Sequence, residues 1–178
     1  MTWIGTVSGR KIDFLEPDPA EFDIEDIATG LAHVNRFAGQ TVTPYSVAQH
    51  SVLCSLYCKS HPFDALMHDF PEAYMNDVPR PLKRLLSEWE DIEKRVYRVG
   101  AEKWGFSYPI PPEVKEVDDR MLFTERRDVQ PDHVAWPWRR NPYLWHVTPW
   151  SAKKARVEFL KRFHELEAKR CVSSVCVA

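Results

Sequence analysis

Residues 63–83 read FDALMHDFPEAYMNDVPRPLK, and this stretch decides how the rest of the chain is interpreted. From Phe63 to Tyr74 the apolar side chains recur at spacings of three and four, which is the pattern of one buried helical face. On a helical wheel, His68, Asp69 and Glu72 share the opposite face within a single turn. We therefore expect a helix that packs through its apolar side and presents an imidazole and two carboxylates.

Helical patterns on both sides of this stretch predict an all-α fold. Asp23 and Ser46 are natural caps for helices that reach about Gly39 and Lys59. Further helices are expected over about 87–104, from the prolines at 109–112 to about 129, and over about 151–169. The two prolines of NDVPRPLK forbid a regular helix at 76–83 and predict a turn of fixed, functional shape.

The segments outside these helices are short. Two β-prone runs around Ser8 and Gly9 predict a small hairpin, which we expect to be peripheral. Residues 130–150 are interpreted as an ordered loop packed by its own aromatic side chains, and 171–178 as a frayed tail.

Length and composition favour one domain over residues 1–178, because 178 residues with 44% hydrophobic content can bury one core. The formal net charge of -2 argues against binding a nucleic-acid polymer or an anionic membrane. A cytoplasmic location is expected, since the sequence shows no leader pattern and no long apolar run. Cys54 and Cys58 lie four apart in an apolar segment and are interpreted as buried free thiols.

Three further residues could join the polar face of the 63–74 segment. His50 lies in a helix that looks buried on all sides, and a core histidine needs either a hydrogen-bond partner or a metal. Asp118 flanks the inner stripe of its helix, whereas Asp119 is expected to point away. Glu125 on that stripe is interpreted as a structural ion-pair partner. Histidines and carboxylates together are the ligand set of a divalent first-row metal.

Three segments carry the elements H, HD and D in order: YSVAQHS at 45–51, ALMHDFPEAYMNDVPRPLK at 65–83 and VKEVDDRM at 114–121. In these segments the sequence resembles the HD-domain phosphohydrolases, and the long middle run is similar to that of bacterial 5′-deoxynucleotidases and their phage relatives. The resemblance covers about residues 23–129 and extends loosely to GRKIDFLEPDP at 9–19. It implies an HD-domain helical bundle with a small N-terminal β-hairpin.

The resemblance also implies a role for each matching position. The metal ligands that it implies are His50, His68, Asp69 and Asp118. Glu72 matches the residue that orients or deprotonates the attacking water, and Asp77 matches a second acid beside the leaving group. The implied substrate contacts are Arg36, Phe37, Pro79 and Lys83. Arg36 would grip the phosphate, although Arg36 and Lys83 could also be solvated surface charges.

The implied function is metal-dependent hydrolysis of a deoxynucleotide. The favoured substrate is dATP, by similarity to small phage enzymes that deplete it, and the alternative is a deoxynucleoside monophosphate, as in the 5′-deoxynucleotidases. Hydrolysis of cyclic nucleotides or guanosine tetraphosphate, and a non-enzymatic helical module, are the other hypotheses. The last of these predicts loss of a ligand or of Glu72, and the sequence has them all.

The cofactor and the assembly are less closely specified. Mixed nitrogen and oxygen ligands accept cobalt, manganese, zinc or iron, so the divalent metal is not identified. The relatives indicate a homo-oligomer, to which the apolar last helix and the tryptophan-rich loop could contribute. Those two segments could instead complete a single core.

Overall fold

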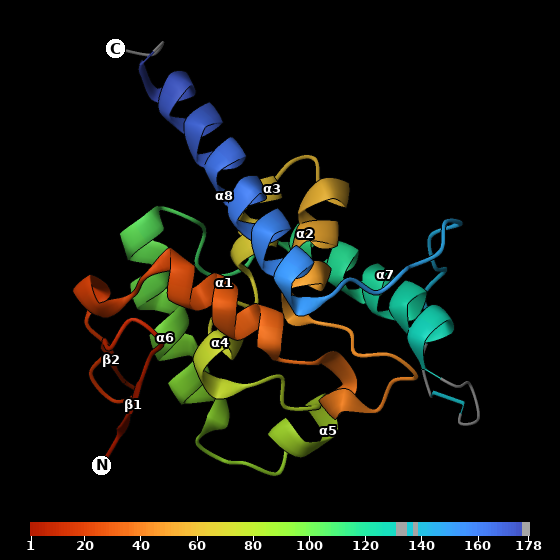
Figure 1. The fold of residues 1–178 in the computed structure, drawn as a ribbon, viewed down its shortest axis with the longest axis horizontal. Helices are drawn as coiled ribbons and strands as arrows, with labels where there is room; N and C mark the ends of the chain where they lie inside the picture. Colours follow the sequence, from red (N-terminus) through yellow and green to blue (C-terminus); the bar gives the residue numbers. More distant parts are fainter. Residues whose placement is uncertain (131–134, 137–138, 176–178) are drawn as a thin grey trace.

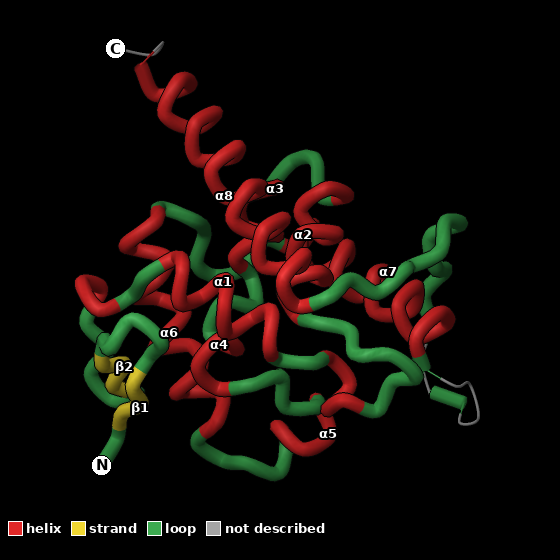
Figure 2. The backbone as a smooth tube through the Cα atoms, in the orientation of Figure 1, coloured by secondary structure: helices red, strands yellow, loops and turns green. Residues whose placement is uncertain are grey.

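The computed structural model describes residues 1–130, 135–136 and 139–175, which are mostly helical apart from one small hairpin (Figures 1 and 2). This confirms the all-α class with an N-terminal β-hairpin. The α-helices in chain order are α1 (Ile24–His33), α2 (Val47–Tyr57), α3 (Pro62–Met67), α4 (Glu72–Met75), α5 (Arg80–Lys83), α6 (Trp89–Trp104), α7 (Pro112–Val129) and α8 (Ala152–Val175). Within the described residues, none of these helices has the length and apolar character needed to cross a membrane.

The hairpin is attached to the core more firmly than the sequence indicates. Strands β1 (Trp3–Gly5) and β2 (Lys11–Asp13) pair antiparallel. Strand β1 is exposed along its length, as expected of a peripheral hairpin, whereas Ile12 of β2 is only 1% exposed and packs into the main core. The hydroxyl groups of Thr6 and Ser8 each donate a hydrogen bond of 2.6 Å to Asp26 on α1. These bonds fix the turn of the hairpin against the first helix.

Helix α8 covers the bundle formed by α1, α2 and α3 (Figure 1). Its inner face consists of Ala155, Phe159, Phe163 and Leu166, which are all buried. The helix continues to Val175. The expected end near residue 169 is therefore wrong, and so is the expected frayed tail over residues 171–175. Residues 176–178 lie outside the described part, as do 131–134 and 137–138 of the predicted loop.

The first helix ends earlier than predicted because the chain turns to pair with the segment before α2. Its last residue is His33 rather than one near Gly39, and Asn35 forms an isolated antiparallel bridge with Ser46. A short 3-10 helix, η2 (Arg36–Gly39), follows this bridge. The bridge places Arg36 close to the start of α2.

The predicted helix over 63–74 is broken at its centre. Helix α3 ends at Met67 and α4 begins at Glu72, because Pro71 has no N–H group and its ring would clash with the carbonyl of Met67. The intervening turn uses hydrogen bonds of three-residue spacing, such as Glu72 N to Asp69 O at 3.0 Å. His68 therefore lies just beyond the end of α3, and Glu72 opens a new helix.

The two prolines after Asp77 permit a short helix instead of excluding one. Helix α5 follows Pro79, and Pro81 lies in its first turn, where a missing N–H costs no helical hydrogen bond. Asn76 has φ 64° and ψ 161°, a backbone conformation that is strained for a residue with a side chain. This strained residue redirects the chain between α4 and α5, next to the candidate site.

Candidate metal centre

Two histidines face one another at the centre of the molecule. His50 comes from α2, and its Nδ1 lies 2.6 Å from Oε1 of Glu125 on α7. His68 follows α3, and its Nδ1 lies 2.9 Å from the carbonyl oxygen of Ala65. Because a carboxylate and a carbonyl accept hydrogen bonds, each Nδ1 donates its hydrogen, and Nε2 is the ring nitrogen that faces the centre. The two Nε2 atoms are 3.3 Å apart, so both nitrogens face one point.

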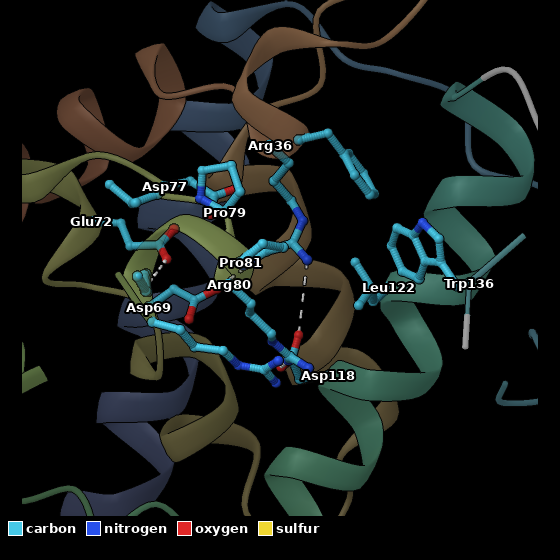
Figure 3. Close-up of a pocket in the computed structure, with 14 residues that line it drawn as sticks. Arg36, Asp69, Glu72, Asp77, Pro79, Arg80, Pro81, Asp118, Leu122 and Trp136 are labelled. Carbon is cyan, nitrogen blue, oxygen red and sulfur yellow. Dashed lines mark hydrogen bonds and ion pairs between the residues drawn. The ribbon is translucent and has the colours of Figure 1, made fainter. Parts of the chain in front are cut away.

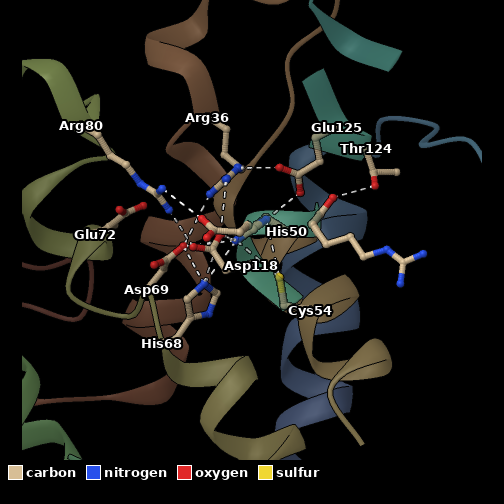
Figure 4. A network of polar contacts seen from close by, with 12 residues as sticks. Arg36, His50, Cys54, His68, Asp69, Glu72, Arg80, Asp118, Thr124 and Glu125 are labelled. Carbon is tan, nitrogen blue, oxygen red and sulfur yellow. Dashed lines mark hydrogen bonds and ion pairs between the residues drawn. The ribbon is translucent and has the colours of Figure 1, made fainter. Parts of the chain in front are cut away.

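Two carboxylate oxygens converge on the same point (Figure 4). Oδ2 of Asp69 lies 3.2 Å from His68 Nε2 and 3.4 Å from His50 Nε2. Oδ1 of Asp118 lies 3.3 Å from His50 Nε2 and 4.0 Å from His68 Nε2. Ligand atoms about 2.0–2.2 Å from one metal ion are roughly 3–3.5 Å from each other. The structure thus brings together the four residues proposed from the sequence as ligands. The distances from His50 to the other three donor atoms, and from His68 to Asp69, fall in this range, whereas the distance from His68 to Asp118 is longer.

Both carboxylates are ionised in this setting. Burial raises the pKa of Asp69, but the facing rings of His68 and His50 outweigh it and hold that pKa well below its usual value. Burial opposes ionisation of Asp118 as well, but hydrogen bonding and charge interaction with His50 lower its pKa to about 2. Burial and the charge of Arg36 lower the pKa of His50, but Cys54, Glu125 and Asp118 raise it well above its usual value. A bound cation would displace the His50 proton, and the centre would then offer two imidazole nitrogens and two anionic oxygens.

Cys54 adds a sulfur atom to this centre. It is fully buried, as predicted, but its Sγ lies 3.5 Å from His50 Nε2. His50, Cys54 and His68 form a buried group that could hold a metal ion. Burial raises the pKa of Cys54 to about 11, so the group is a neutral thiol at neutral pH and a weak ligand. The ionised carboxylates are the stronger ligands beside the two histidines.

Arg36 is an internal residue and not a solvated surface charge. Its side chain is only 8% exposed, and its Nε donates a hydrogen bond of 2.9 Å to Oε2 of Glu125. Its two terminal nitrogens lie 3.5 Å from Asp69 and 3.9 Å from Asp118. Burial lowers the pKa of Arg36, but Glu125 and the other nearby carboxylates raise it well above the usual value. A permanent positive charge thus lies beside the candidate ligands.

The centre opens into a cavity of about 420 Å³ (Figure 3). The sequence-predicted residues that line it are Arg36, Phe37, Asp69, Glu72, Asp77, Pro79, Lys83 and Asp118. His50 and His68 are not among its lining residues. Leu122 and Trp136 add an apolar wall on the side of α7. The predicted metal, catalytic and substrate residues therefore belong to one site.

Glu72 is a buried acid at the edge of this cavity. Its side chain is 7% exposed, and Oε1 lies 3.6 Å from Lys83 Nζ. Among the described residues, no group hydrogen bonds to its buried Oε2. Burial raises the pKa of Glu72 well above the usual value, and the charges of Asp69 and Asp77 raise it further. Burial also raises the pKa of Asp77, although the charge of Arg36 opposes this.

Comparison with known proteins places the chain in a family. No family model matches it. It is 39% identical over 177 residues to the uncharacterized protein YfdR of Escherichia coli (strain K12), in a match that covers 96% of this chain and 99% of YfdR. The chain belongs to the YfdR family. An uncharacterized protein of Rhodobacter capsulatus, RCAP_rcc00048, is 35% identical over 124 residues, which cover 64% of this chain and 63% of that protein.

In this member of the YfdR family, several site residues were missed by the sequence interpretation. Arg80 donates hydrogen bonds to Asp118 at 3.0 Å and to Asp119 at 3.1 Å. Asp119 does not line the cavity, but it is linked to the site through Arg80. The hydroxyl of Tyr45 donates to Glu125 at 2.7 Å. The position of Glu125 on the inner stripe was the signal for its role, and its predicted ion pairing is confirmed. No sequence spacing indicated the contacts of Arg80.

Proposed function

We propose that this protein is an HD-domain, metal-dependent phosphohydrolase that acts on deoxynucleotides. The observation that carries the proposal is the convergence of His50, His68, Asp69 and Asp118, whose facing donor atoms lie between 3.2 and 4.0 Å apart. A cavity with basic side chains in its wall reaches Asp69 and Asp118. This combination of donors and cations is suited to a substrate that bears phosphate.

The four donor residues would hold a divalent first-row metal such as cobalt, manganese or zinc. When bound, such a cation supplies Lewis acidity, which makes water a better nucleophile near neutral pH and draws charge from a phosphoryl oxygen. Glu125 holds His50 in the tautomer that leaves Nε2 available. Arg36 donates a hydrogen bond to the other oxygen of Glu125, so both oxygens of this carboxylate are bonded and its position is fixed.

The side chains of the chain itself move the protons in this proposal. The Oε2 atom of Glu72, kept basic by burial, takes a proton from the attacking water. The water oxygen then bonds to phosphorus while the bond from phosphorus to the leaving oxygen breaks. Asp77 is placed in the cavity wall to return a proton to that oxygen, and its raised pKa suits an acid. Arg36 and Lys83 bind phosphoryl oxygens.

The cavity also supports the proposed substrate class. Its volume of about 420 Å³ lies within the range of about 300–1,000 Å³ that is typical for small-ligand sites. Phe37, Leu122 and Trp136 form an apolar part against which a base can pack. The four basic residues in the wall are Arg36, Arg80, Lys83 and Arg84. Such a concentration of cations favours a triphosphate, with dATP as the first candidate, over the alternative monophosphate.

The experiment that tests this function compares the native protein with an Asp69→Asn variant in the presence of cobalt or manganese. Release of nucleoside and of phosphate species is measured for deoxy- and ribonucleotide mono- and triphosphates. We expect metal-dependent turnover of dATP by the native protein and none by the variant. Turnover of monophosphates alone would instead identify a 5′-deoxynucleotidase, and no turnover of any nucleotide by metal-loaded protein would refute the proposed function.

Metal binding itself is measured in parallel through the melting temperature. A cation present at about 100 times its dissociation constant adds about 2.7 kcal/mol to the free energy of unfolding. For a domain of this size, that corresponds to a rise of roughly 5–10 °C. We expect this rise in the native protein and its absence in the Asp69→Asn variant.

A further inference from the structure

We infer that Arg80 and Asp119 form a relay that positions Asp118 as a metal ligand, and that also fixes α5 against α7. Neither residue touches the histidines in this arrangement. The inference rests on the proposed metal centre. It assigns a role to the second aspartate of the EVDDR segment and to the arginine between Pro79 and Pro81.

The two oxygens of Asp118 have different surroundings. Oδ1 faces the centre, 3.3 Å from His50 Nε2, whereas Oδ2 accepts a hydrogen bond of 3.0 Å from Arg80 Nη2. A carboxylate held in this way cannot rotate about its last bond without losing the bond to Arg80. Arg80 therefore holds the plane of the carboxylate, so that one oxygen of Asp118 faces the histidines while the other accepts its hydrogen bond.

Asp119 holds the arginine in place. The Nη1 atom of Arg80 donates to Oδ1 of Asp119 at 3.1 Å, so one guanidinium bridges two carboxylates that follow one another on α7. The planar fork of an arginine matches such a bridge, which a lysine ammonium cannot reproduce with the same geometry. Although Arg80 is 52% exposed, the two aspartates are only 18% and 24% exposed, so their charges are partly shielded from water.

The relay also connects the two walls of the cavity (Figure 3). Arg80 begins the short helix α5, which follows Asp77 and ends at Lys83. Both Asp77 and Lys83 line the cavity, so the bond from α5 to Asp118 and Asp119 holds these two side chains opposite α7. Loss of the relay is expected to change both the orientation of Asp118 and the positions of Asp77 and Lys83 in the cavity wall.

Removing Asp119 should weaken metal binding even though Asp119 is not a ligand. Without Asp119, Arg80 would pair more fully with Asp118 and compete with the cation for the charge of that carboxylate. Removing Arg80 instead would free Oδ2 and allow the carboxylate to rotate. Both changes lower the fraction of protein in which an oxygen of Asp118 is available to a cation beside the two histidines.

The test measures the affinity for Co²⁺ by competition with a chromophoric chelator. The variants are Asp119→Asn, Arg80→Ala and the double variant. The control is Glu116→Gln, which removes the same charge from an exposed position on the same helix. We expect the dissociation constant to rise about 10-fold in each single variant, as is typical for partners of ligands, and to change less than about 2-fold in the control. Because Asp119 acts through Arg80, the double variant should bind Co²⁺ with about the same dissociation constant as each single variant.

The outcomes separate the relay from the metal centre. If the native protein binds Co²⁺ and both single variants bind as tightly as the Glu116→Gln control, the relay is refuted and the metal centre stands. If the native protein binds no Co²⁺, both inferences fall. Circular dichroism checks the fold of each variant. The Asp119→Asn variant keeps the shape of the side chain. If Arg80→Ala does not fold, the Co²⁺ affinity of Asp119→Asn alone tests the relay.

Discussion

The Nδ1 atom of His50 lies 2.6 Å from Oε1 of Glu125, and both side chains are fully buried. Glu125 comes from α7 and His50 from α2, so this contact joins two helices that are far apart in the sequence. Tyr45 and Arg36 bond to the same carboxylate, which leaves it with little freedom to move. The orientation of the His50 ring is thus set by the carboxylate behind it and by the two residues that bond to that carboxylate.

Replacing Glu125 with Gln should therefore weaken metal binding. An amide N–H turned toward His50 would favour the tautomer with hydrogen on Nε2, which cannot ligate. We expect a dissociation constant for Co²⁺ about 10–100 times that of the native protein. Urea denaturation should show a loss of about 3 kcal/mol, because a buried charged partner is removed. An affinity equal to that of the Glu116→Gln control would contradict this role.

Replacing Glu72 with Gln should separate catalysis from metal binding. Glu72 is placed to accept a proton and not to ligate, so we expect kcat to fall by about 10²–10⁴-fold. The dissociation constant for Co²⁺ should stay within about 3-fold of the native value. Both quantities are measured on the same preparation. A parallel loss of metal affinity would show that Glu72 supports the centre instead.

The stability of the segment after residue 139 should depend on pH through Asp128. Burial alone would raise the pKa of Asp128, but bonds from Arg127, the Val147 N–H and His146 lower it to about 2 from 3.8. Because the folded pKa lies below the unfolded one, the stabilisation is complete above about pH 4 and is lost as the pH falls toward about 2. A shift of this size corresponds to about 2 kcal/mol.

An Asp128→Asn variant provides the measurement. Its deficit in the free energy of unfolding, relative to the native protein, should be about 2 kcal/mol at pH 7 and should shrink as the pH is lowered from 4 to 3. Urea denaturation at several pH values gives this difference directly. A deficit that does not change with pH would mean that the charge of Asp128 contributes nothing to stability.

Replacing Gly100 with Ala should destabilise the core beneath the site. An added Cβ would lie 2.2 Å from Cζ of Phe70, whose ring is held by Phe22 and Tyr97 on other sides. We expect the overpacking to cost about 1–3 kcal/mol in urea denaturation despite the better helix propensity of Ala. Gly5→Ala is the matched control, since nothing lies within 4 Å of its added Cβ. Equal stability of the two variants would mean that the ring moves freely.

The sequence predicted those parts of the fold that depend on local signals. The Asp23 and Ser46 side chains accept bonds from the first turns of α1 and α2, as their residue types indicated. The break at Pro71 had a signal, which the helical periodicity of the surrounding residues outweighed in the interpretation. Pro81 was interpreted as a helix breaker although the first turn of a helix tolerates proline.

The candidate site was predictable only where the residues themselves carry chemistry. His68 and Asp69 stand out because they adjoin in a helical segment, and the structure does bring them to His50 and Asp118. The bridge made by Arg80 depends on how α5 docks against α7. Such docking is decided by tertiary packing, so the spacing of residues along the chain does not reveal it.

The donor atoms of the centre come from positions scattered along the chain, with Asp118 and the supporting Glu125 both on α7. During synthesis, a growing chain that ends before α7 has His50, His68 and Asp69 but neither of these carboxylates. The complete donor set exists only after about two thirds of the protein has left the ribosome and α7 has docked against α2. A shortened chain that stops before this helix would thus lack the complete set of donor atoms.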